Sequence, residues 1–245
     1  VARVAVDDRS LMRLGTAPVV TRRLLLALST SCLVQLPAPP ASAKVFSDPR
    51  FLLDVPDGFI VSKRKAVTGT IFVAGNFPRA TVMSVVAWPL AALIDDDAKG
   101  RELPGIPSLD PSSRFNKKAS TLEEVGSAKD IAQLLLRARD KEASGGALQS
   151  ILLSGEFIDG RLQIQYATES PVADPDALEK ERGVRQLIRR TASASIFGSV
   201  AGADGKPESA IFSIFASALE QDWDKDLQEP LQRAVNSFSL VTATA

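Results

Sequence analysis

The feature that most constrains the fold is a β-hairpin in the middle of the chain. Residues 150–158 and 161–168 are both rich in strand-forming side chains, and the Asp-Gly pair at 159–160 predicts a two-residue turn between antiparallel strands. In the second arm, polar residues alternate with the apolar side chains of Leu162, Ile164 and Tyr166. This period of two predicts a strand with one buried face and one solvent-exposed face. The chain is therefore expected to build an antiparallel sheet that is covered on at least one side.

Strand patterns recur along the rest of the chain and end at turn residues. They occupy residues 51–55, 59–61, 69–74, 81–88, 186–197 and 209–218. Two long segments, residues 95–120 and 170–185, lack a clear period and are expected to be loops.

Two segments change to a helical period. Ser127 and Asp130 predict a capping box, after which Ile131, Leu134, Leu135 and Ala138 form one apolar stripe. A second stripe, with Pro230 in its first turn, comprises Leu227, Leu231, Ala234, Val235 and Phe238. Because each helix is apolar on one side only, each is expected to cover a sheet, which gives the α+β class.

Two absences restrict the chemistry that the sequence offers. The chain contains no histidine, which removes the usual general base and the commonest zinc ligand. Its one cysteine, Cys32, lies in a segment that is expected to be removed. Residues 1–43 carry a net charge of +3 and the remainder −3. A mildly acidic body does not predict nucleic acid as a partner, since phosphate binding needs a basic surface.

The first 43 residues contain the parts of an export signal. Arg22 and Arg23 precede a weakly apolar run that ends near Leu36, and Ala41-Ser42-Ala43 resembles a cleavage site. Paired arginines before a weakly apolar segment resemble a twin-arginine signal. The run spans about a dozen residues and is shorter than the ~20 that a bilayer-spanning helix needs. We therefore expect cleavage between Ala43 and Lys44, leaving residues 44–245 as one mature domain.

Residues 1–20 precede this signal and are interpreted as the remnant of an organelle transit peptide. Asp7 and Asp8 fit that interpretation poorly, because transit peptides contain few acidic residues. Two alternatives to the export signal remain open. One is a buried N-terminal helix, and the other is lipid attachment at Cys32.

Three landmarks follow one another in residues 46–242. Phe59 comes after Val55-Pro56-Asp57-Gly58, residues 122–127 form a turn ahead of the first helix, and Trp223 and the final helix precede Ser237-Phe238-Ser239-Leu240. Their order resembles the opening strand, the turn and the ending of the PsbP family, extrinsic proteins of the thylakoid lumen associated with photosystem II.

This resemblance implies an α/β/α sandwich around an antiparallel sheet, with non-enzymatic binding to a membrane complex through protein contacts. It also implies that the protein supports the oxygen-evolving complex by retaining calcium and chloride, or assists assembly. The chain departs from the family at Phe59, where a tryptophan is expected a few residues on, and in the enlarged segment 95–120. Metal binding through histidine cannot carry over, because the chain has none. These departures favour a divergent PsbP-domain protein.

Two charged clusters are candidate sites. Asp95, Asp96 and Asp97 form an acidic triplet with the oxygen ligands that calcium prefers, although a solvated loop explains three consecutive acids equally simply. Lys63, Arg64 and Lys65 form a basic triplet, and Arg189 and Arg190 form a basic pair. They are candidates for docking onto an acidic lumenal surface, although ordinary surface charge explains them as simply. Trp223 is interpreted as core beneath the final helix.

The sequence is thus interpreted as that of a non-enzymatic, peripheral protein of the thylakoid lumen. Its expected partner is the lumenal face of photosystem II or an assembly intermediate, and no cofactor other than calcium is suggested. Two alternatives remain: an assembly factor for photosystem I or the NDH complex, and an unrecognised lumenal enzyme.

Overall fold

Each arm of the predicted hairpin forms a strand of a large antiparallel sheet. In the computed structural model, β6 (Gln149–Ile158) pairs with β7 (Arg161–Ser170) through the predicted turn. Asp159 has φ 51° and Gly160 has φ 71°. Positive φ at both turn positions is the type I′ geometry that matches the twist of the strands, so the hairpin prediction is confirmed.

The structure describes residues 43–63, 69–100, 114–144, 149–170, 172, 174–202 and 204–241. These residues lie in one compact unit that spans Pro40–Ala245. The predicted signal at residues 1–42 and two members of the basic triplet, Arg64 and Lys65, fall outside the described residues.

The large sheet has seven strands in the order β3-β4-β5-β9-β8-β7-β6, and every neighbouring pair is antiparallel. Its other strands are β3 (Ile60–Val61), β4 (Thr70–Asn76), β5 (Thr81–Pro89), β8 (Leu187–Ala201) and β9 (Pro207–Leu219). A one-turn 3-10 helix, η1 (Phe77–Arg79), joins β4 to β5. The strands expected from the sequence are therefore present, with ends that differ by a few residues.

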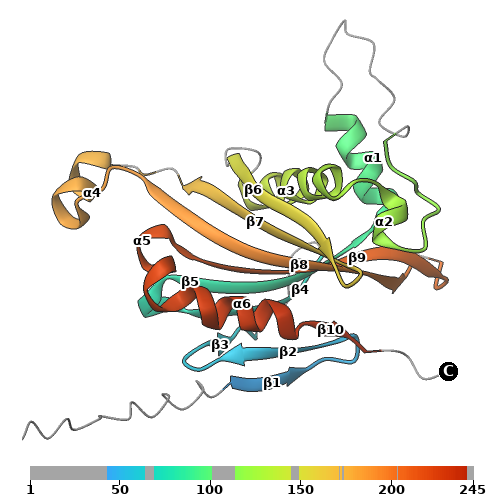
Figure 1. Cartoon of the computed structure of the whole chain (residues 1–245), viewed down its shortest axis with the longest axis horizontal. Helices are drawn as coiled ribbons and strands as arrows, with labels where there is room; N and C mark the ends of the chain where they lie inside the picture. Colours follow the sequence, from blue (N-terminus) through green and yellow to red (C-terminus); the bar gives the residue numbers. More distant parts are fainter. Residues whose placement is uncertain are drawn as a thin grey trace, which may run out of the picture. The chain divides into compact units, whose positions relative to one another are not determined.

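Helices α1 (Leu90–Gly100), α2 (Leu122–Val125) and α3 (Ala128–Ser144) cover one face of this sheet, as Figure 1 shows. The helix α3 begins with the predicted capping box: Ser127 Oγ accepts a hydrogen bond from the Asp130 amide at 3.2 Å. A Cβ at Gly155 of β6 would lie 3.2 Å from Ala132 Cβ. The missing side chain at this position lets α3 approach the edge of the sheet closely.

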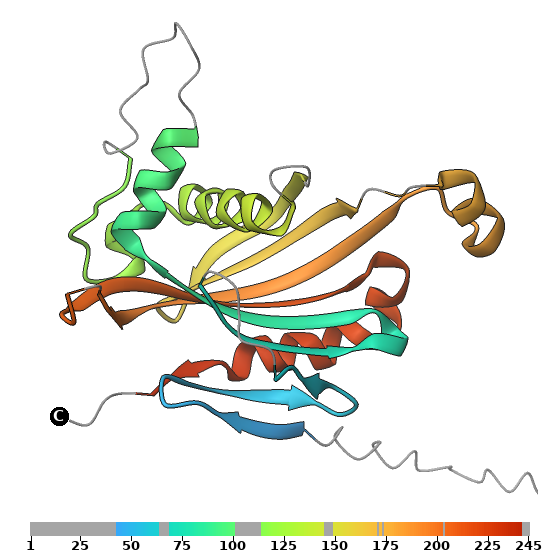
Figure 2. The same ribbon diagram turned by 180° about the vertical axis from the view of Figure 1, so that it is seen from behind.

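The opposite face is covered by the C-terminal helix and a second sheet (Figures 1 and 2). After α5 (Glu220–Asp222), a π-helical turn, η3 (Trp223–Leu227), leads into α6 (Gln228–Ser237). The small sheet has the order β1-β2-β10, formed by β1 (Ala43–Ser47), β2 (Phe51–Pro56) and β10 (Ser239–Leu240). The first residues of the predicted mature chain therefore form an edge strand against β2.

Alternation along the strands sorts side chains into two cores. On β9, Phe212, Ile214 and Ala216 enter the core beneath α6 and β2. Ile211 and Phe215, on the same strand, enter the core beneath α1 and α3. Helices on one side, and a helix with a small sheet on the other, confirm the predicted α+β class and α/β/α sandwich.

Both predicted loops contain a helix, so neither is a loop throughout. Residues 95–100 belong to α1, which begins directly after Pro89. Residues 114–120 are irregular as expected, and residues 101–113 lie outside the described residues. Residues 175–182 form α4 (Pro175–Arg182), with Asp174 as N-cap and Gly183 in the left-handed conformation after its end. An N-cap acid, a first-turn proline and a C-terminal glycine are the local signals of such a helix. They were missed because α4 has no apolar stripe.

Trp223 is 5% exposed and lies in the core beneath α6, as predicted. Replacing Trp223 with alanine is expected to lower the free energy of unfolding by about 3–5 kcal/mol, because the change leaves a large cavity. Phe77→Ala is the control: Phe77 is 79% exposed, so its loss should change stability by less than about 0.5 kcal/mol. Urea unfolding measures both. Similar losses for the two variants would contradict the assignment of Trp223 to the core.

Candidate functional site

Arg189 and Arg190 point to opposite faces of β8, because successive side chains alternate along a strand. Arg189 Nη2 donates to the carbonyl oxygen of Ala80 at 2.7 Å and to Ser217 Oγ at 3.3 Å. Arg190 Nε donates to Glu220 Oε1 at 3.0 Å on the other face. One flat surface therefore cannot present both arginines to a partner.

The other predicted docking residues lie apart from this pair in the sequence. Lys63 is exposed just beyond β3, and the structure does not describe Arg64 and Lys65. Docking through the basic triplet of Lys63, Arg64 and Lys65 stays a prediction.

Each member of the acidic triplet faces a different cation from its position on α1. Asp95 Oδ1 accepts from Lys117 Nζ at 2.5 Å, and Asp96 lies 3.9 Å from Lys141 Nζ. Asp97 accepts from Arg137 Nε at 2.5 Å and Nη2 at 3.1 Å. The triplet is therefore not a solvated loop. It forms the acidic side of a seam that ties α1 to α3 and to Lys117.

This arrangement separates the carboxylates instead of converging them on one point. Within the described residues, no group of three or more acidic, histidine or cysteine side chains is placed to hold a metal ion. Calcium binding by Asp95, Asp96 and Asp97 would require their ion pairs to break. Whether the protein binds calcium elsewhere stays a prediction.

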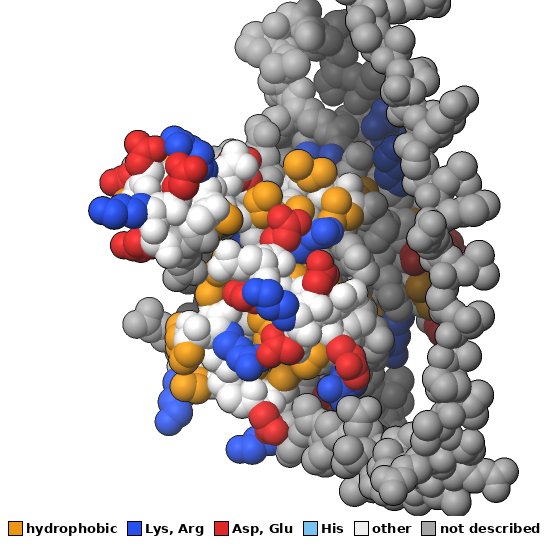
Figure 3. Space-filling view, turned by 60° about the vertical axis from the view of Figure 1, so that its left-hand side comes forward, with side chains coloured by type: hydrophobic (Ala, Val, Ile, Leu, Met, Phe, Trp, Pro, Cys, Tyr) orange, Lys and Arg blue, Asp and Glu red, His pale blue; other side chains and the backbone are white. Residues whose placement is uncertain are grey.

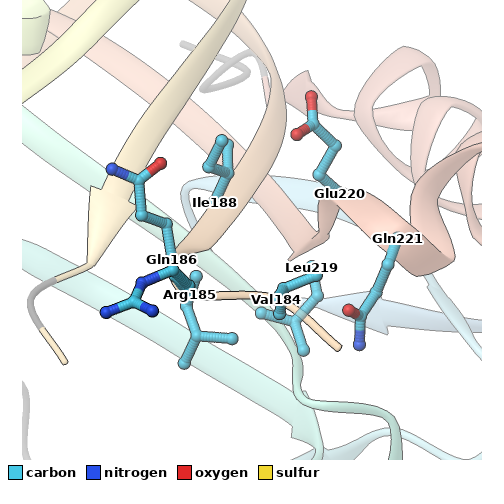
Figure 4. Close-up of a pocket in the computed structure, with 8 residues that line it drawn as sticks. Val184, Arg185, Gln186, Ile188, Leu219, Glu220 and Gln221 are labelled. Carbon is cyan, nitrogen blue, oxygen red and sulfur yellow. The ribbon is translucent and has the colours of Figure 1, made fainter. Parts of the chain in front are cut away.

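A pocket of about 390 Å³ opens where β8 begins and β9 ends. Its apolar lining comprises Val184, Leu187, Ile188 and Leu219. Figure 4 shows Arg185 and Gln186 on one side of it, and Glu220 and Gln221 on the other. Its charged members are already paired, since Arg185 binds two acids of α4 and Glu220 binds Arg190. The pocket therefore offers a partner mainly apolar surface.

The segment beside this pocket, residues 174–186, is here called the α4 arm. It lies at the far end of β7 and β8, away from α1, α2 and α3 and on the same side as α5 (Figures 1 and 2). Every described position of α4 is exposed except Leu178, which is half-buried. On the face that Figure 3 turns forward, acidic and basic side chains are intermixed with exposed apolar ones.

Local contacts, and not burial, hold the α4 arm in shape. Asp174 Oδ1 accepts from the Ala177 amide at 2.9 Å. Arg185 donates to Asp176 and to Glu179 at 2.7 Å each. An isolated helix of eight residues is marginal in water, so these caps and ion pairs carry the stability of α4.

A second polar region lies on the α3 side of the large sheet. Hydroxyl side chains line the middle of β8 and β9 there: Thr191, Ser193, Ser195, Ser213 and Ser217, all buried. Ser195 and Ser213 hydrogen-bond to one another at 2.7 Å. We call these five residues the hydroxyl face.

Arg139 of α3 lies over the hydroxyl face. Its guanidinium carbon is 4.2 Å from the ring centroid of Phe215 and 5.8 Å from that of Tyr166. Burial raises the pKa of the Tyr166 phenol, and the Arg139 charge partly offsets that rise. Burial lowers the pKa of Arg189, and the charge of Arg139 acts in the same direction.

The sequence contained one signal of this region. Thr191, Ser193 and Ser195 alternate with Ala192 and Ala194, which predicts a strand with one hydroxyl-bearing face. Burial of that face could not be read from the strand, because Arg139 reaches it from a distant helix.

No helix in the described part of the chain is long and apolar enough to cross a bilayer. No protein-family model matches the chain, and no curated protein matches it. Among solved structures the chain is similar to cyanobacterial PsbP (CyanoP) from Synechocystis sp. PCC 6803, with a TM-score of 0.48 and 18% identity. The match covers 84% of this chain and 96% of that one. The chain resembles PsbP in fold.

The chain is also similar to LpqN of Mycobacterium tuberculosis, a protein involved in cell envelope biogenesis. The TM-score there is 0.34 and the identity 9%, over 83% of this chain and 87% of that one.

The seam between α1 and α3 allows a matched test within the acidic triplet. Asp97 is 6% exposed and binds Arg137 through both carboxylate oxygens, so Asp97→Ala is expected to cost about 1.5–3 kcal/mol of unfolding free energy. Asp96 and Lys141 are each 65% exposed, so Asp96→Ala should cost less than about 0.5 kcal/mol. Urea unfolding of both variants measures the difference. Equal losses would contradict a structural role that is particular to Asp97.

Proposed function

We propose that the protein is a non-enzymatic, extrinsic protein of the thylakoid lumen that docks on photosystem II or one of its assembly intermediates. There it helps the oxygen-evolving complex to retain calcium and chloride, or helps the complex to assemble. The twin-arginine pattern around Arg22 and Arg23 and the PsbP-like landmarks from Val55 to Leu240 support this proposal.

The observation that carries the docking function is the α4 arm. Its side chains add little to either core, since Leu178 is the only described position of α4 that is not exposed. The arm nevertheless has a capped helix and a double ion pair at Arg185 that hold it in one conformation. A surface element that already has its bound conformation loses less conformational entropy on binding a partner than a flexible loop does.

The pocket beside the arm supplies the apolar part of the docking surface. An apolar side chain of the partner that enters between Val184 and Ile188 would be removed from water on binding. No ion pair would have to break, because Arg185 and Glu220 keep their partners within the chain. The ion pairs around the rim are exposed, and such charges steer association more than they hold the complex. We therefore place the docking surface at the α4 arm and its pocket.

Retention on thylakoid membranes tests this surface. The tagged protein is expressed in chloroplasts, and the amount that stays bound is measured by co-purification across a salt series. Val184→Asp places a charge in the pocket and is expected to weaken retention at least tenfold, which corresponds to about 1.4 kcal/mol. Arg185→Gln removes both ion pairs of the arm and should weaken retention less. Both variants should keep their unfolding free energy within about 0.5–1 kcal/mol, because the changed groups are at the surface.

Arg233→Gln is the matched control, since Arg233 makes a similar exposed ion pair with Glu229 on α6. It is expected to retain full binding. A combined Lys63→Gln, Arg64→Gln and Lys65→Gln variant tests the surface predicted from the sequence. The assignment to the arm would be overturned if this triple variant lost binding while Val184→Asp bound like the unchanged protein. That result would place docking at the basic triplet. Co-purification with partial complexes only would identify an assembly factor.

The leader can be tested separately from docking. Changing Arg22 and Arg23 together to lysine is expected to block import into the lumen, because the twin-arginine route recognises the arginine pair. The mature N-terminus of the imported protein should lie at Lys44 or within a residue or two of it. Import followed by N-terminal sequencing measures both. Recovery of residues 20–40 in the mature protein would contradict a cleaved signal.

A further inference from the structure

Two buried hydroxyl groups near α3 have no hydrogen-bond partner among the residues that the structure describes. They are the phenol of Tyr166, which is 1% exposed, and Ser193 Oγ, whose residue is 2% exposed. The neighbouring Thr191 hydroxyl acts to lower the pKa of Tyr166 but does not meet hydrogen-bond geometry with the phenol. A buried polar group without a partner costs about 1–3 kcal/mol, so each calls for a partner outside the chain.

Two half-buried guanidinium groups lie beside these hydroxyls without a carboxylate. Among the described residues, Arg139 stacks on Phe215 and Tyr166 but makes no hydrogen bond or ion pair. Arg189 donates only to neutral oxygens, those of Ala80 and Ser217. A cation that is partly withdrawn from water is stabilised when an anion lies near it, and among the described residues neither guanidinium has one.

The strand register places these groups on one face of the sheet. Tyr166 of β7 pairs with Thr191 of β8, and Thr191 pairs with Ser217 of β9. Ser193 and Arg189 lie two positions from Thr191 in either direction along β8, so their side chains share its face. Arg139 covers this face from α3.

The geometry points to a binding site for a small monocarboxylate between Arg139, Arg189, Tyr166 and Ser193. All four side chains donate hydrogen bonds, which an anion accepts and a cation cannot. The planar fork of a guanidinium matches the two oxygens of a carboxylate. Among the described residues, the other charge that acts on Tyr166 is Asp140, which accepts from Ser150 at 2.9 and 2.7 Å. With Asp140, the cluster carries a net charge of +1, which suits a monovalent anion.

Size and affinity follow from the same geometry. The hydroxyl face is buried, so the ligand must be small, as formate and acetate are. A ligand of three or four non-hydrogen atoms cannot bind much more tightly than about 0.1–1 mM. The site is therefore expected to sense the millimolar concentration of a carboxylate. It does not depend on the docking function proposed above.

Titration with sodium formate and sodium acetate, at an ionic strength kept constant with sodium chloride, tests the site. Calorimetry should show saturable binding with a Kd of about 1–10 mM. Amide NMR shifts should centre on Thr191 and Ser193. Each step of the titration replaces chloride with an equal concentration of carboxylate. Binding is therefore detected only if the site prefers the carboxylate to the spherical chloride ion.

Tyr166→Phe is the decisive variant, since it removes one donor and leaves the core volume unchanged. It is expected to raise the Kd at least threefold, and Arg139→Gln at least tenfold. Arg189→Gln should act like Arg139→Gln, but Arg189 also supports Ala80 and its loss could disturb the fold. Arg137→Gln is the matched control, two residues away on α3 and paired with Asp97, and should bind like the unchanged protein.

Three results would overturn the proposal. The first is no saturable carboxylate binding up to about 50 mM, well above the bound that ligand size sets. The second is an unchanged Kd in Tyr166→Phe. The third is an equal loss of affinity in Arg137→Gln and Arg139→Gln, which would show that the net charge of α3, and not the site, attracts the anion.

Discussion

Strand β9 is buried on both of its faces, and the two layers of the domain meet through it. Its side chains enter the core beneath α6 at every second position and the core beneath α3 at the positions between. Antiparallel pairing with β5 on one side and β8 on the other satisfies its backbone. A shift of the register by one residue would exchange the two sets of side chains. The hydrogen bond between Ser195 and Ser213 lets polar groups lie in this buried position without a large desolvation cost.

Most elements with local signals could be predicted from the sequence, although α4, which has caps but no apolar stripe, was missed. Contacts between residues far apart in the sequence could not be predicted. The Asp-Gly turn at 159–160, the capping box at Ser127 and the apolar stripe of α6 each act over a few residues, and each is present. The end of α1 was taken for a loop because three consecutive acids suggest solvent. Their cations, Lys117, Arg137 and Lys141, lie at least 20 residues away along the chain, where no periodicity connects them to α1.

The candidate sites divide in the same way. A period of two along β8 is enough by itself to separate Arg189 from Arg190, since neighbours on a strand face opposite ways. The sequence interpretation grouped them by charge alone. The crowding of Arg139 against Tyr166 and Phe215 joins a helix to two strands, and it follows only from how closely α3 packs on the sheet. The sequence thus identifies the charged side chains. Which of them lack an ion-pair partner depends on how the helices and strands pack together, and that could not be predicted.

Charge is used differently in the two regions that we assign to function. At the α4 arm, Arg185 is neutralised by Asp176 and Glu179, and the helix carries its own caps, so the arm can change in sequence without loss of core packing. Beneath α3, neither Arg139 nor Arg189 has a carboxylate partner among the described residues, and the sheet tolerates this because its two cores supply the stability. A fold that keeps such cations beside buried, unpartnered hydroxyls retains a cost that replacing one of these groups would relieve. Such a cost is understandable if an anion occupies the site in the working protein.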